Sequence, residues 1–144
     1  MNNKSGQSLF EVILSLAIIS IIIITLISLA SNSIRNTTFS KNKTLSSRLA
    51  QEAVEWIRGE RDASWTEFFD KVPSSNYCLQ NLEWTNTGIC SGEEFVQGTI
   101  LTRNLTLTSV PPSQVRTEVE VSWEDSQGQH TTRVVTDFTN WQGN

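Results

Sequence analysis

The sequence is poor in the residues on which enzymes and metal sites depend. Its 144 residues include one histidine, two cysteines and three prolines. His130 is expected on a turn, and there is neither a CxxC pair nor a glycine-rich phosphate loop. The acidic stretches Glu60–Asp62 and Glu93–Glu94 are better explained as solvated loop charges than as an acid and base pair. We therefore expect no enzyme activity, no cofactor and no metal.

Charge is also sparse, and it excludes a further class of protein. Charged residues make up 18% of the chain, the net charge is −4, and no run of like charges occurs. A protein that binds nucleic acid directly needs a basic surface, and none is predicted here. The length suggests one modest domain with an appendage.

The appendage is a long apolar run near the amino terminus. No charged residue occurs from Val12 to Ile34, and "VILSLAIISIIIITLISLA" (Val12–Ala30) has 19 residues. A helix needs ~20 apolar residues to span the hydrocarbon of a bilayer. The serines and threonine within the run can bond back to the helix backbone, so they are compatible with a membrane helix.

Two ordinary explanations of this run are a secretory signal peptide and a signal anchor. The segment "LASNS" (Leu29–Ser33) could serve as the cleavage site of a signal peptide. A signal anchor would account for the span. Neither explanation gives a role to Glu11, a carboxylate at the mouth of the apolar run.

The leader suggests a third explanation. "MNNKSG" (Met1–Gly6) is short and polar, carries Lys4, and ends in a glycine directly before the apolar segment. Together with Glu11, this arrangement resembles the signal of type IV prepilins and pilin-like proteins. The resemblance implies that a prepilin peptidase cuts between Gly6 and Gln7 and methylates the new amino group of Gln7. Two positions depart from the usual pattern: Gln7 replaces the more common Phe or Met, and Ser28 stands where many major pilins carry a proline.

Under this resemblance Glu11 is the fifth residue of the mature chain. A lone charge at the centre of a membrane helix costs ~2.5–3.5 kcal/mol on insertion scales, and less near the interface. The new amine of Gln7 would lie about 6 Å away along a helix. The resemblance implies that Glu11 pairs with the amine of an adjacent subunit and so sets the axial register of a filament. The alternative is an interfacial glutamate without a role.

The direction of insertion is not decided by charge. Lys4 precedes the span, whereas Arg35, Lys41 and Lys43 follow it. The cysteines farther along favour a cytoplasmic amino terminus and an extracytoplasmic head, since disulfides form outside the cytoplasm.

Beyond the span the periodicity continues as a helix. An apolar stripe runs through Leu45, Leu49, Ala53 and Trp56/Ile57. We expect one long helix from Ser8 to Arg58, ended by Gly59, with a break in the polar residues 31–44 left open. Residues 59–97 have little periodicity. Within them, Cys78 and Cys90 enclose eleven residues, which suggests a disulfide worth about 3 kcal/mol, with two free buried thiols as the alternative.

The alternating pattern in the last third of the chain predicts strands. "QVRTEVEVSWE" (Gln114–Glu124) alternates, with Val115, Thr117, Val119, Val121 and Trp123 on one face. After a turn at Asp125–Gln129, "HTTRVVTDFTNW" (His130–Trp141) is the expected partner strand, and Thr99–Val110 is a third. The prediction is an α+β fold: a long helix, embedded in the membrane by its first half, packs its second half on a three-stranded antiparallel sheet. This arrangement of a sheet against the second half of a long helix also resembles the globular head of pilins.

The hypothesis is a leader at residues 1–6, a membrane and filament-core helix at 7–30, its continuation at 31–58, and a head at 59–144. The function expected is that of a subunit, a minor pilin, of a type IV pilus or related filament. The alternatives are a pseudopilin of type II secretion or DNA uptake, a monomeric anchored binding module, and a tethered hydrolase without a recognisable site. The expected partners are prepilin peptidase, other pilin subunits, an inner-membrane assembly platform and, before assembly, membrane lipid. Nucleic acid is expected only through an assembled filament.

Overall fold

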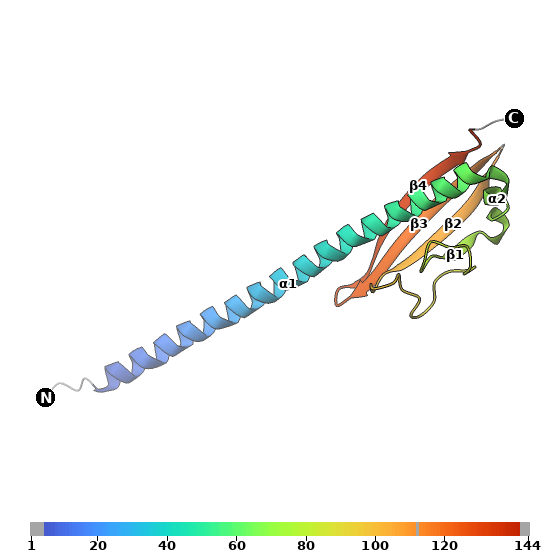
Figure 1. Cartoon of the computed structure of the whole chain (residues 1–144). Coiled ribbons are helices and arrows are strands. Elements are labelled where there is room, and N and C mark those ends of the chain that lie inside the picture. The colour runs from blue at the N-terminus through green and yellow to red at the C-terminus, as the bar shows by residue number, and fades with distance from the viewer. Residues whose placement is uncertain (1–4, 112, 142–144) are drawn as a thin grey trace. The chain divides into compact units, whose positions relative to one another are not determined.

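The computed structural model describes residues 5–111 and 113–141, and it confirms the α+β class (Figure 1). The chain divides into two compact units, Met1–Lys41 and Asn42–Asn144, which are described separately below. The elements in order are α1 (Ser5–Ala63), α2 (Trp65–Phe69), a short 3-10 helix η1 (Val72–Ser74), β1 (Asn76–Cys78), β2 (Thr102–Val110), β3 (Gln114–Asp125) and β4 (Gly128–Thr139).

Helix α1 is longer than predicted at both ends, and its assignment has no break in the polar residues 31–44. Hydroxyl side chains bond back to the carbonyl four residues earlier, at distances of 2.7 to 3.0 Å. These bonds explain why polar residues are accommodated in an apolar helix, because each hydroxyl has a partner without water. The donors are Ser15, Ser20, Thr25, Ser28 and Thr37.

The prediction that Gly59 ends the helix is wrong, because α1 continues to Ala63. A glycine inside a helix costs about 1 kcal/mol relative to alanine. The residues that follow it make contacts that offset this cost. Glu60 accepts a hydrogen bond from Trp84 Nε1 at 2.7 Å, the Arg61 guanidinium lies 5.1 Å from the centre of the Phe138 ring, and Asp62 accepts from Trp141 Nε1 at 3.0 Å.

The predicted three-strand meander is present as β2, β3 and β4, and the sheet has one further strand. Its order is β1-β2-β3-β4 with antiparallel neighbours. Strand β1, which is three residues long, was not predicted, and neither were α2 and η1, because none of them is long enough to show a period. His130, expected on a turn, lies within β4, and its ring stacks on Trp123 at 5.1 Å between ring centres.

The core of the second unit lies between the last part of α1 and one face of the sheet. The five β3 residues predicted to share a face are all buried. Opposite them, Ala50 and Ala53 of α1 are completely buried. Figure 1 shows this part of α1 alongside β3 and β4. Also buried on α1 are Leu49, Val54 and Ile57, whereas Leu45 and Trp56 of the predicted stripe are only half-buried.

Candidate functional site

The first candidate site is the amino-terminal part of α1, which is apolar and uncovered. Its large apolar side chains from Leu9 to Ile34 are 50% to 68% exposed. The 18-residue window that defines the span has a mean hydropathy of 3.0, and none of that window is buried. A helix of this length and composition can cross a membrane, where lipid would cover the surface that the chain itself leaves bare.

Glu11 lies within this surface. Its side chain is exposed, and its backbone carbonyl accepts a hydrogen bond from Ser15 Oγ at 2.8 Å. Among the residues that the structure describes, the carboxylate has no recorded partner, and the next charged residue along the chain is Arg35. A carboxylate without a partner would be costly in lipid.

The backbone of the expected cleavage site lies in the first turn of the same helix. Helix α1 begins at Ser5, so the Gly6–Gln7 peptide bond is within it. From residue 7 to Glu11 is four residues, or about 6 Å along a helix axis. Met1–Lys4 of the expected leader lie outside the described residues.

Comparison with known proteins decides what this segment is. Residues 1–27 match the family model of the prokaryotic N-terminal methylation motif. The chain carries the type IV prepilin signal. The matched range includes Gly6, Gln7 and Glu11, and it is confined to the start of the chain, so it identifies this segment and not the whole protein. The signal and the long apolar helix together fit a membrane anchor. No curated protein and no solved structure matches the chain.

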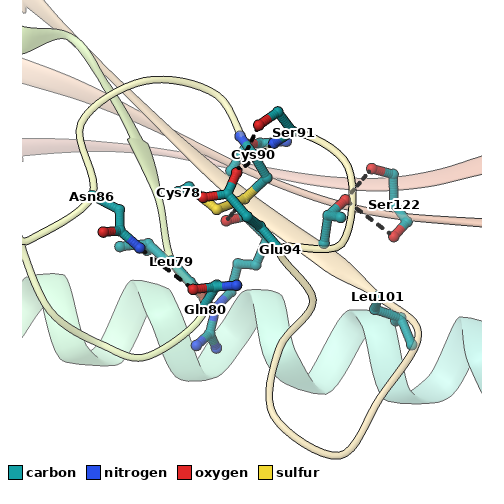
Figure 2. The surroundings of a disulfide bond; sticks show 12 residues. Cys78, Leu79, Gln80, Asn86, Cys90, Ser91, Glu94, Leu101 and Ser122 are labelled. Atoms are coloured by element: carbon teal, nitrogen blue, oxygen red, sulfur yellow. Dashed lines mark hydrogen bonds between the residues drawn. A yellow bond between two sulfur atoms is a disulfide. The ribbon is translucent and has the colours of Figure 1, made fainter.

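The head of the chain is held by a disulfide between Cys78 and Cys90 (Figure 2). The bond joins β1 to the loop that precedes β2. Next to it, Asn104 on β2 accepts a hydrogen bond from the Cys90 amide at 2.7 Å. Within the enclosed loop, Trp84 packs against Trp56 of α1 at 4.6 Å and against Tyr77 of β1 at 5.0 Å between ring centres. The loop is therefore fixed to the helix and to the sheet as well as by the disulfide.

Arg103 on β2 is a structural residue that the sequence analysis missed. Its side chain is only 2% exposed, and it donates to the carbonyls of Leu79 at 3.1 Å and Leu49 at 3.2 Å and to Glu52 at 3.2 Å. Burial lowers the pKa of this guanidinium, and the nearby Glu52 carboxylate opposes that effect. The sequence did contain a signal for this burial. Arg103 is odd-numbered like Leu101, Leu105 and Leu107, so alternation places its side chain on their face of the strand, and these leucines all face the core.

A hollow lies on the outer face of the sheet. It has a volume of about 510 Å³ and is lined by the loop after Cys90 and by residues of β2 and β3. Phe95 and Ile100 contribute partly exposed apolar groups, and Glu120 and Glu124 contribute carboxylates. Neither cysteine nor histidine is available there as a nucleophile or base, since Cys90 is bridged and His130 is not among the lining residues. Within residues 5–111 and 113–141, no group of three or more His, Cys, Asp or Glu is arranged to hold a metal.

Proposed function

We propose that this chain is a structural subunit, a minor pilin, of a type IV pilus or a related filament. The observation that carries the proposal is the prepilin signal at residues 1–27 on a helix whose apolar surface is bare. Bare apolar helices pack against lipid before assembly and against one another in a filament. The choice of a minor subunit rests on the small head and on Ser28 in place of a helix proline.

The proposed route begins with insertion of α1, with its amino terminus in the cytoplasm and the head outside. Prepilin peptidase then cuts between Gly6 and Gln7 and methylates the amine of Gln7. Residues 1–6 are removed, residues 7–30 form the filament core, and residues 31–58 continue the helix to a head at 59–144. An assembly platform in the inner membrane extracts the subunit, which joins other pilin subunits at the cell surface. Any contact with nucleic acid is made by the filament.

Glu11 supplies the specificity of this assembly. An unpaired carboxylate in a membrane helix costs ~2.5–3.5 kcal/mol at the helix centre. The amine of Gln7 on a neighbouring subunit relieves that cost only when the two helices have the correct axial offset. A charge that is costly alone and favourable when paired selects one register among the many that apolar packing allows.

The test is incorporation of a Glu11→Ala subunit into filaments, with Ser15→Ala as the matched control. Ser15 lies one turn along the helix, and its hydroxyl bonds only to the Glu11 carbonyl among the contacts recorded for it. We expect Glu11→Ala to insert in the membrane and to be cut normally but to enter filaments at least about tenfold less, as expected from the loss of ~1.4 kcal/mol or more. Ser15→Ala should assemble like the wild type. Normal incorporation of Glu11→Ala would refute this role, whereas a wild-type chain that inserts in the membrane but never enters filaments would favour a monomeric anchored binding module.

A further inference from the structure

The free edge of the sheet is the feature from which a second interaction follows. β4 is the last strand in the sheet order, so among the described residues no strand pairs with its outer edge. The strand has 12 residues and contains neither proline nor lysine, two residues that commonly protect exposed edges. A long edge of this kind can pair with another strand, because its outward N–H and C=O groups have the spacing of a ladder.

The backbone hydrogen bonds of the sheet show which β4 residues face this edge. Leu79 N donates to Arg103 O, and Leu107 N donates to Ser75 O, so odd-numbered residues of β2 direct their backbone groups toward β1. Backbone groups point to alternate sides along each strand, so even-numbered residues of β2 bond to even-numbered residues of β3. Odd-numbered residues of β3 then bond to even-numbered residues of β4. Odd-numbered residues of β4 therefore direct their backbone groups to the free edge.

The same odd-numbered residues carry their side chains on the outer face, away from α1. The even-numbered residues lie opposite the buried positions of β3, as Phe138 does opposite Val115. On the outer face, Val135 is 50% exposed and has Arg133 on one side and Asp137 on the other. An apolar residue thus lies midway between two opposite charges, and this pattern is complementary to itself when the strand is reversed.

We propose that β4 pairs antiparallel with β4 of a second copy of this chain, about a twofold axis at Val135. In this register Val135 lies opposite its own equivalent, and Arg133 of each copy lies opposite Asp137 of the other. All these residues face the edge with their backbone groups, so Val135 and its equivalent form a hydrogen-bonded pair. An axis at Arg133 or at Asp137 would instead set like charges opposite each other, which is unfavourable.

The charges already paired within each head extend this complementarity. Arg116 Nε lies 2.9 Å from Asp137 Oδ1, and Arg133 Nη2 lies 3.0 Å from Glu120 Oε2. Across the proposed interface, four charged side chains would lie in one row: Arg116 and Asp137 of one copy, then Arg133 and Glu120 of the second copy. The signs alternate along the whole row, so each carboxylate at the interface gains a second guanidinium without losing the first.

The symmetry determines which copies can meet. A twofold axis perpendicular to the sheet makes the head parts of α1, Asn42–Ala63, antiparallel in the two copies. This inference rests on the proposed function, under which neighbouring subunits of one filament have parallel helices. An antiparallel contact therefore joins heads on two filaments or on two cells. A single edge contact is small and weak, but contacts repeated along two filaments gain strength through effective concentration.

The experiment measures spin-label distances on the full-length chain in detergent, with the native disulfide intact. A label on Thr131→Cys should give a distance of ~27 Å in the dimer, since eight residues of extended strand separate it from its equivalent, plus the label arms. The dimer should form as protein concentration rises and weaken as salt rises, because Arg133 and Asp137 are 57% and 42% exposed.

Val135→Lys is the disruptive variant, since it would place two cations opposite each other at the axis. We expect it to weaken dimerisation at least about tenfold, whereas Val135→Thr and Thr85→Lys should not. Thr85 is exposed in the loop beside β1, at the opposite edge of the sheet, so its variant controls for an added cation. A chain that stays monomeric, a dimer with another label distance, or a Val135→Lys variant that dimerises normally would overturn the proposal. None of these outcomes bears on prepilin cleavage or on Glu11, which other measurements test.

Discussion

Replacement of Arg103 tests how the head is held together. This guanidinium is the link between β2, the Leu79 segment and α1, and its side chain is only 2% exposed. Glu52, its ionic partner, is 52% exposed. Solvent therefore screens the ion pair, and we expect packing and the two carbonyl contacts to contribute more than the charge pair does.

The expected magnitudes differ among three variants. Arg103→Ala removes two buried methylenes, worth about 1.6 kcal/mol, and leaves the buried Leu79 carbonyl without its donor, which costs about 1–3 kcal/mol. The expected loss of stability is thus about 2.6–4.6 kcal/mol. Arg103→Met keeps the apolar stem and should cost about 2 kcal/mol. Glu52→Gln should cost less than about 1 kcal/mol.

The assay is chemical denaturation of the full-length protein in mild detergent, followed by tryptophan fluorescence. All five tryptophans lie between Trp56 and Trp141, so the signal reports on the head and not on the membrane segment. For a domain of about 100 residues, the Arg103→Met variant should also melt about 10 °C lower. If Glu52→Gln cost as much as Arg103→Ala, or if Arg103→Ala cost less than about 1 kcal/mol, the reasoning would be refuted.

Two further predictions concern the head. The double variant Cys78→Ala/Cys90→Ala should lose about 3 kcal/mol by the loop-entropy estimate, measured by the same denaturation, and an unchanged midpoint would contradict a disulfide that stabilises the head. Hydrogen bonding to Arg116 lowers the pKa of Asp137, so its contribution is present above the ordinary value of 3.8 and is lost as pH falls toward the lower folded pKa. Stability should therefore fall with acid below about pH 4, and less steeply in Asp137→Asn; an identical acid profile would count against this ion pair.

The sequence predicted those parts of the fold that repeat a period over many residues. The β3 alternation from Val115 to Trp123 named five buried residues correctly. The stripe on α1 was partly right, since Leu49, Ala53 and Ile57 are buried. Strand β1 was not predictable in this way, because three residues do not establish a period and its pairing partner, Leu105, is distant in sequence.

The missed features depend on tertiary contacts. Helix α1 continues past Gly59 because Glu60, Arg61 and Asp62 meet Trp84, Phe138 and Trp141, and these partners lie 24 to 79 residues away in sequence. The role of Arg103 likewise depends on carbonyls of two other segments. By contrast, the prepilin signal is readable from sequence because the peptidase recognises a short linear segment, and residues 1–27 match the family model.

The central claim is that the prepilin signal is used, and the mass of the amino terminus tests it most directly. The protein would be purified from membranes of cells that contain an active prepilin peptidase, with a Gly6→Leu variant expressed in parallel. We expect the wild-type chain to begin at Gln7, with or without one added methyl group, and the variant to keep its leader. A wild-type chain that begins at Met1 in those cells, or one cut after Leu29–Ser33, would contradict the account.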